Sequence, residues 1–373
     1  MKQFEFIIYG ATLEGLLTGY YLHQKGFKTL ILESTDKAGK YFASIDHAQA
    51  SIHSLFTTPS YDDNSLRVAE WIKKNFFNIE AVKKSLPPTT FEKGHFEPFV
   101  GFGEHAPKES EFLQDFLFAD RMEFTPSVSE WIKTILTSGL EIRYNSTLTA
   151  INVAEGKITD ITINDKDTLI PRNFIFAENP SDLIEFLDLE TTAGKAVSAK
   201  ALARLSKGNF WSTLQLSIAH KTPITDKEEI HVLYGTQKNP VVSVGKFQGS
   251  TSQWISFINS DVPDINEEGV HILKELKRQL KRAYPEALND HEFDKIALWP
   301  KTHGYIDLKS KRFGQLEGIE NIGLCSNHLV EHTNPFIGAL TAAQYTTEII
   351  NNLISNQSKV HTEDLPAIDL VNA

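Results

Sequence analysis

The first forty residues combine short apolar runs with one apolar stripe at helical spacing. Residues 4–9 (FEFIIY) are rich in β-branched and aromatic side chains, which is typical of a strand buried on both faces of a parallel sheet. From Leu13 to Tyr21 the apolar positions follow a helical period, and Gly26 ends this helix before a second apolar run at residues 29–32. The pattern therefore predicts a strand, a tight turn, a helix and a second strand.

Helical spacing of apolar residues returns in four later segments. In the second of them, Ser127 and Glu130 have the spacing of a capping box, and Gly139 follows the last apolar position. Pro285 lies directly after the third segment, where it prevents the helix from continuing. The predicted helices cover residues 65–76, the stretch between Ser127 and Gly139, residues 267–284 and residues 338–352.

Other apolar runs predict strands in a parallel sheet and one hairpin. Two alternating runs within residues 147–163 meet at Glu155-Gly156, which predicts a hairpin. The continuous runs have the character of strands that are covered on both faces. They cover residues 141–144, 174–177 and 321–325.

Between residues 202 and 258 the apolar period changes to two. Leu214, Leu216 and Ile218 alternate with polar residues, which predicts an antiparallel sheet. The segment from residue 87 to residue 107 is rich in proline, glycine and phenylalanine instead. We predict that this segment is irregular and serves as a lid or as an insertion in a substrate lobe.

The first turn has the composition of a site for a dinucleotide. A strand that enters a helix through glycines presents free backbone N–H groups and the positive end of the helix dipole, which favours a pyrophosphate. Gly10 and Gly15 supply this turn, and Glu33 at the end of the second strand is placed to bind an adenosine ribose. Thr12 stands where the G-x-G-x-x-G fingerprint has its middle glycine. A plain α/β unit with incidental glycines is the alternative.

Composition and charge narrow the possible partners. The 373 residues have room for two or three lobes, and an apolar fraction of 41% is ordinary for a globular protein. A formal net charge of −11 disfavours nucleic acid and anionic membrane surfaces as partners. Cys325 is the only cysteine, and no apolar run reaches membrane-spanning length. We therefore expect a cytoplasmic protein with no integral membrane segment.

In this order of elements, three motifs resemble those of the flavin amine oxidase and protoporphyrinogen oxidase superfamily. Residues 32–40 (LESTDKAGK) are similar to the end of the family's nucleotide unit. Residues 129–151 resemble the segment whose backbone meets the adenine. Residues 324–327 (LCSN) and 334–340 (NPFIGAL) resemble the family's Gly-Asp step and the helix N-terminus under the isoalloxazine. The resemblance covers most of the chain.

The resemblance implies an α/β fold, in which a Rossmann-like FAD-binding domain with a parallel sheet is joined to an antiparallel-sheet substrate domain. We expect the FAD-binding domain to be discontinuous, because the substrate lobe is inserted into it twice. The expected ranges are 1–60, 115–185 and 306–355 for the FAD-binding domain, 61–114 and 186–305 for the substrate domain, and 356–373 for a polar tail.

The resemblance also implies an FAD-dependent oxidoreductase that moves hydride from a C–N or C–C bond of a small molecule to the flavin, with dioxygen as the final acceptor. Trp299, Lys301 and Tyr305 are the implied catalytic residues. The implied cofactor-binding residues are Gly10, Ala11, Thr12, Leu13, Glu14, Gly15, Glu33, Ser34, Gly39, Lys40, Leu148, Ser326, Asn327, Phe336, Ile337 and Gly338.

Two other functions are compatible with parts of the sequence. The altered motifs, with Thr12 and Lys40 in place of glycine and arginine, also fit a flavoprotein-like module that has lost catalysis and acts as a binding or assembly partner. Residues 328–332 (HLVEH) match the H-x-x-E-H pattern of zinc peptidases. That pattern needs a helix, whereas here it follows a predicted strand and Pro335 stands three residues beyond it. We therefore predict no metal site.

Overall fold

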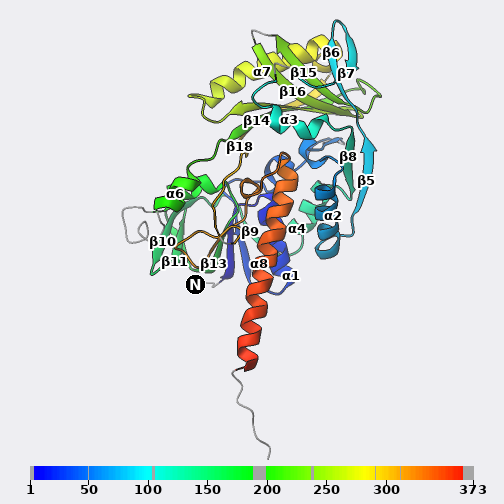
Figure 1. The fold of residues 1–373 in the computed structure, drawn as a ribbon. Coiled ribbons are helices and arrows are strands. Elements are labelled where there is room, and N and C mark those ends of the chain that lie inside the picture. The colour runs from blue at the N-terminus through cyan, green and yellow to red at the C-terminus, as the bar shows by residue number, and fades with distance from the viewer. Residues whose placement is uncertain are drawn as a thin grey trace, which may run out of the picture.

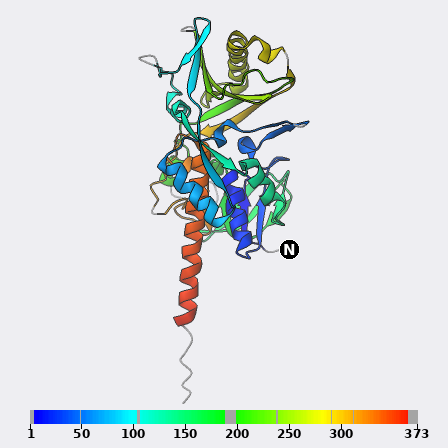
Figure 2. The same cartoon turned by 90° about the vertical axis from the view of Figure 1, so that its right-hand side faces the viewer.

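The chain folds into two lobes, one built on a parallel sheet and the other on an antiparallel sheet (Figure 1). The structure is a computed structural model, and it describes residues 4–48, 50–102, 106–187, 199–236, 239–289, 291–310 and 312–363. Figures 1 and 2 show the antiparallel sheet at one end of the molecule and the parallel sheet at the other, with the C-terminal helix extending away from both.

Five parallel strands form the first sheet, in the order β19-β13-β1-β2-β9. Their apolar sequences follow from burial on both faces, since Ile8 packs toward the helices while Tyr9 packs toward a smaller sheet. This confirms the predicted parallel sheet. The strands are β1 (Phe4–Tyr9), β2 (Thr29–Leu32), β9 (Glu141–Arg143), β13 (Pro171–Phe176) and β19 (Ile322–Leu324).

Helices cover one face of this sheet, and a three-stranded sheet covers the other. Ser127 and Glu130 form the predicted capping box, in which Glu130 accepts the Ser127 backbone N–H at 2.7 Å. The covering elements are α1 (Leu13–Gln24), α2 (Asp63–Asn75), α4 (Val128–Leu136) and α8 (Pro335–Glu363) on one face, and β10 (Leu148–Ala154), β11 (Lys157–Ile163) and β12 (Asp167–Leu169) on the other.

The second sheet has seven strands in the order β18-β14-β17-β16-β15-β6-β7, and α7 (Ile265–Ala283) packs on one of its faces. Pro300 is tolerated in β18 because that strand lies at the edge of the sheet. The strands are β6 (Pro88–Glu92), β7 (His95–Pro98), β14 (Trp211–His220), β15 (Ile230–Thr236), β16 (Asn239–Gln248), β17 (Thr251–Asn259) and β18 (His291–His303).

Two sequence predictions about the fold were wrong in detail. The segment at residues 87–107 contains the β6–β7 hairpin, because Lys93 and Gly94 both adopt positive φ and form a tight turn that extends the sheet. The last helix continues to Glu363 instead of ending near residue 352, while residues 364–373 of the expected polar tail lie outside the described residues.

The other described elements are short. They are β3 (Ile45–His47), β4 (Ala50–Ile52), β5 (Glu80–Ser85), β8 (Asp120–Thr125), α3 (Ser110–Leu113), α6 (Ala199–Leu205) and the 3-10 helices η1 (Lys40–Phe42), η2 (Leu55–Thr57), η4 (Gln114–Leu117), η5 (Pro180–Phe186), η6 (Pro285–Leu288) and η7 (Asn327–Leu329). Among the helices of the described residues, none combines the length and the apolar character needed to cross a bilayer.

Candidate functional site

The turn between β1 and α1 is built so that backbone atoms approach one another closely. Gly10 has φ of +108°, a conformation that side chains disfavour. A Cβ atom on Gly15 would lie 2.2 Å from the carbonyl oxygen of Gly10, so only glycine fits there. Thr12 is the N-cap of α1, where its hydroxyl accepts the Gly15 N–H at 3.2 Å and donates to the Ala177 carbonyl at 3.0 Å. The predicted glycine turn therefore has the expected shape.

Glu33 lies at the end of β2 beside this turn, and its side chain is fully buried. Its Oε2 atom accepts the backbone N–H of Ala11 at 2.8 Å. Its Oε1 atom accepts the backbone N–H of Thr35 at 2.9 Å and the Thr35 hydroxyl at 2.8 Å, and the Ser34 hydroxyl donates to it at 3.3 Å. The carboxylate thus ties the loop after β2 to the turn after β1.

The loop after β2 lies across the glycine turn. Gly39 donates its backbone N–H to the Ala11 carbonyl at 2.8 Å, which fixes the loop on the turn. The next residue, Lys40, forms an ion pair with Glu178, which lies two residues beyond the carboxyl end of β13. Burial disfavours the charged Lys40, but the neighbouring Glu178 raises the pKa of Lys40 above its ordinary value. Lys40 is therefore positively charged, and it belongs to the loop that lies across the turn.

Glu14, in the first turn of α1, is almost completely buried at 3% exposure. Its Oε1 atom accepts the backbone N–H of Asn327 at 3.2 Å. Burial raises the pKa of Glu14 to about 7, although hydrogen bonds and Lys40 oppose this shift. The side chain therefore changes charge near neutral pH.

Among the residues predicted to contact the rest of a cofactor, several polar groups form hydrogen bonds within the protein. Leu148 donates its backbone N–H to the Tyr9 hydroxyl at 3.3 Å. The Ser326 hydroxyl caps η7, and the Asn327 side chain donates to the Thr302 carbonyl at 3.2 Å. Three other predicted cofactor-binding residues are buried in the hydrophobic core, namely Leu13, Phe336 and Ile337. A Cβ atom on Gly338 would lie 3.3 Å from the Cβ atom of Asn327.

The three predicted catalytic residues differ in their contacts and exposure. Trp299 is half-buried, donates its indole N–H to Gln215 at 2.8 Å and packs edge-on against Tyr41 with ring centroids 6.1 Å apart. Lys301 forms an ion pair with Asp182 at 2.6 Å. Tyr305 is 42% exposed. Through Tyr41, the residue after Lys40, Trp299 is connected to the loop that lies across the glycine turn.

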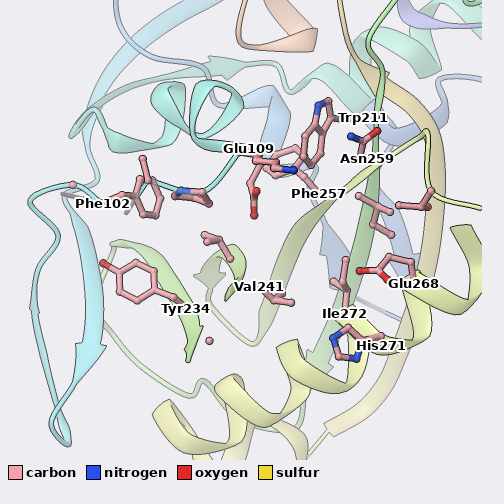
Figure 3. A pocket seen from close by; sticks show the side chains of 18 of the residues that line it. Phe102, Glu109, Trp211, Tyr234, Val241, Phe257, Asn259, Glu268, His271 and Ile272 are labelled. Atoms are coloured by element: carbon pink, nitrogen blue, oxygen red, sulfur yellow. The ribbon is translucent and has the colours of Figure 1, made fainter. Parts of the chain in front are cut away.

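A cavity of about 860 Å³ lies in the second lobe, where the ends of β14, β15, β16 and β17 meet the start of α7. Figure 3 shows Trp211, Phe257 and Tyr234 around it, with Glu109 pointing into it from the covering segment. Burial raises the pKa of Glu109 above its ordinary value. The size and the apolar lining suit a small organic molecule.

A series of aromatic ring contacts runs from this cavity toward the glycine turn. The His303 ring lies 4.9 Å from Phe257 in the cavity wall and 5.5 Å from Phe56 on its other side. Phe56 in turn packs edge-on against Tyr41 at 5.7 Å, beside Trp299. The described residues therefore link the two sites by a continuous layer of rings.

Solved structures with this two-lobe architecture include three oxidoreductases. A triple mutant of putrescine oxidase matches with a TM-score of 0.65 and 11% identity, over 94% of this chain and 99% of that one. Cyclohexylamine oxidase from Brevibacterium oxydans matches with a TM-score of 0.62 and 10% identity, over 94% of this chain and 100% of that one. This chain has the fold of these amine oxidases. An oxidoreductase from Methanosarcina mazei also matches, with a TM-score of 0.60 and 12% identity, over 92% of this chain and 99% of that one.

At these identities the likeness establishes the fold, and it confirms the predicted combination of a parallel-sheet lobe and an antiparallel-sheet lobe. Neither a family model nor a curated protein matches the sequence. The activity of this chain therefore depends on its own residues around the glycine turn and the cavity.

The H-x-x-E-H residues occupy a short 3-10 helix and the loop after it, which is not the helical arrangement that the zinc-peptidase pattern needs. His328 contacts the Gly304 carbonyl through Nδ1 at 3.2 Å, and His332 accepts the Asn334 N–H at 3.0 Å. Within the described ranges, no three histidine, cysteine or carboxylate side chains are grouped as metal ligands.

Sequence reasoning missed Glu178, although it bonds to the predicted Lys40. Its position was visible in the sequence, since it directly follows the buried run at residues 174–177. The carboxyl ends of neighbouring parallel strands meet at one edge of the sheet, which is where ligands bind in open α/β folds. Charged residues directly after such strands are therefore candidates for the site.

Proposed function

We propose that this protein is an FAD-dependent oxidoreductase that oxidises a small organic molecule. The observation that carries the proposal is the glycine turn between β1 and α1, set in the fold of the amine oxidases. In such a turn the backbone N–H groups and the helix dipole attract a pyrophosphate. The cavity in the second lobe supports a small-molecule substrate with an apolar body.

The turn has the outline of a dinucleotide-binding turn, and a neutral Glu14 lowers the negative charge around it. The absence of a side chain at Gly15 lets the start of α1 pack closely on the end of β1, because a Cβ atom there would overlap the Gly10 carbonyl. Lys40 supplies a positive charge at the same place, although it is paired with Glu178. With Glu14 protonated, Lys40 and the positive end of the α1 dipole favour an anion at this place.

In this proposal Glu33 holds the ribose, while the turn and Lys40 hold the phosphates. FAD, when bound, supplies a two-electron acceptor for the hydride that leaves the substrate. The packed rings of Tyr41, Trp299 and Phe56 exclude water from the interior side of the site. Burial raises the pKa of the Cys325 thiol to about 12, so this residue holds no thiolate for a covalent link.

A second candidate function is a cofactor-free binding module on the same fold. The observation that favours it is the internal satisfaction of the donors and acceptors that a cofactor would use. Tyr9 accepts from Leu148, Glu14 accepts from Asn327, and Glu33 is fully buried with donors on both oxygens. In that case the cavity in the second lobe would be the only one of the two sites that binds a ligand.

A Glu33→Ala variant tests whether FAD is held at this turn. Removing the carboxylate deletes charge-assisted hydrogen bonds worth roughly 1.5–3 kcal/mol, so the affinity for FAD should fall more than tenfold. The matched control is Thr12→Gly, which removes one capping hydroxyl and should change affinity by only about 1 kcal/mol. Titration of the apoprotein followed by flavin fluorescence measures both, with circular dichroism to check folding.

If the Glu33→Ala variant is folded and binds FAD as tightly as the parent, the nucleotide is not held as proposed. The cofactor-binding residues assigned around the turn would then have to be abandoned together.

A further inference from the structure

The side chain of Glu14 is bonded to the loop after β19, which is part of the predicted cofactor site. Glu14 follows the glycine turn in the first turn of α1, and its carboxylate accepts the backbone N–H of Asn327. Asn327 is one of the residues predicted to contact the cofactor. A carboxyl oxygen of the protein is thus present where the fold brings the turn and the loop after β19 together.

The groups that face Glu14 make this region rich in negative charge. The buried Glu33 and the partly buried Glu178 are two further carboxylates around the turn, and Lys40 is the cation that interacts with all three. A pyrophosphate diester would add two further negative charges. The titratable and polar groups around Glu14, element by element, are Thr12 at the start of α1, Glu33 after β2, Lys40 and Tyr41 in η1, Glu178 after β13, Cys325 after β19 and Asn327 in η7.

We propose that Glu14 determines whether the turn accepts a pyrophosphate, and that the turn binds a pyrophosphate diester only when Glu14 carries a proton. This inference rests on the proposed function, because it concerns the same turn. The ionised side chain accepts the Asn327 N–H and repels the phosphates. The protonated side chain removes one negative charge and offers an O–H donor to a phosphate oxygen.

The direction of the resulting pH dependence follows from burial. Burial raises the pKa of Glu14 to about 7, so the free protein binds a proton there below this pH and loses it above. If only the protonated form binds, the apparent affinity falls about tenfold for each pH unit above 7. Between about pH 6 and about pH 8.5 the expected loss is about thirtyfold.

Two ligands separate this inference from the proposed function. FAD tests the whole cofactor, whereas ADP-ribose carries the same adenosine and pyrophosphate diester without the flavin. Both should bind the parent about thirtyfold more tightly at about pH 6 than at about pH 8.5. The Glu14→Gln variant should bind each ligand with similar affinity at both pH values, and at the higher pH it should bind about thirtyfold more tightly than the parent.

The matched control is Asp36→Asn, which removes a carboxylate from the exposed part of the loop after β2. This variant should keep the pH dependence of the parent. Isothermal titration calorimetry measures the affinities, and circular dichroism checks that each variant is folded. Glu14→Ser is a second neutral variant for the case in which Glu14→Gln does not fold.

Three outcomes of these titrations distinguish the inference from the proposed function. The inference would be overturned if the parent bound FAD with equal affinity at both pH values and the Glu14→Gln variant bound FAD as tightly as the parent. The proposed function would then still stand. A pH-dependent affinity for ADP-ribose without any binding of FAD would support the inference and overturn the flavin function. If neither ligand binds the folded neutral variants at either pH, the charge of Glu14 is not the barrier and both proposals fail.

Discussion

Replacing Asp115 by alanine is expected to lower the free energy of unfolding by about 3–5 kcal/mol, because the change leaves the charge of Arg121 buried without its partner. Both side chains are almost completely buried, and their closest N and O atoms lie 2.9 Å apart. The Asp115 carboxylate also accepts the Asn334 side-chain N–H at 2.7 Å and the Ser60 backbone N–H at 3.0 Å. The pair thus joins the segment before α2 to the start of α8.

Chemical denaturation measures this loss, and Glu320→Ala is the control. Glu320 pairs with Lys157 on the surface, where its side chain is 72% exposed, so that variant should unfold close to the parent. A loss for Asp115→Ala no larger than that of the control would show that the buried pair does not hold the two segments together.

The contribution of Asp115 should also depend on pH in a defined direction. Burial raises the pKa of Asp115, but the charge of Arg121 and the hydrogen bonds from Asn334 and Ser60 lower it by more. The pKa of Asp115 therefore lies below its ordinary value. A carboxylate with a lowered pKa in the folded state stabilises above its unfolded pKa of about 4 and loses this effect as pH falls through the folded value. The difference between the parent and Asp115→Asn should therefore shrink below about pH 4.

Replacing Gly15 by alanine is expected to destabilise the protein by about 3 kcal/mol or more, at the upper end of the range for overpacking. The new Cβ atom would lie 2.2 Å from the Gly10 carbonyl oxygen and 2.9 Å from the Ala177 side chain. Both Gly10 and Ala177 belong to the packed ends of neighbouring parallel strands. The start of α1 would have to move, which also disturbs the proposed phosphate site.

Gly269 provides the matched control, because it is also a helical glycine. A Cβ atom there would make only ordinary contacts, at 3.7 Å to Ile258 and 3.9 Å to Leu298. Gly269→Ala should therefore stabilise α7 by up to about 1 kcal/mol through helix propensity. Thermal unfolding of the two variants should move in opposite directions, and a stable Gly15→Ala protein would contradict the described turn.

Much of the fold followed from sequence patterns with clear physical causes. The runs at residues 4–9 and 174–177 are apolar on both faces because helices cover one side of the parallel sheet and a second sheet covers the other. The capping box at Ser127 was equally readable, since its hydrogen bonds are local in sequence. The β6–β7 hairpin was missed because proline and glycine flank its short strands, and its pairing with β15 connects residues far apart in the chain.

The candidate site was predictable in position but not in its internal bonds. The spacing of Gly10, Gly15 and Glu33 located the turn, because each has a role that only its own residue type fills. The bonds from Glu14 to Asn327 and from Lys40 to Glu178 connect residues far apart in the chain, so no local pattern reveals them. Charge at the site depends on these long-range contacts.

The most direct test of the central claim is the visible absorbance spectrum of the purified protein after incubation with excess FAD at about pH 6, where Glu14 is mainly protonated. After unbound FAD has been removed, the account predicts a yellow protein with flavin bands, and denaturation should release FAD because the cofactor is not covalently linked. A folded protein that stays colourless after this treatment would contradict the account and favour the cofactor-free module.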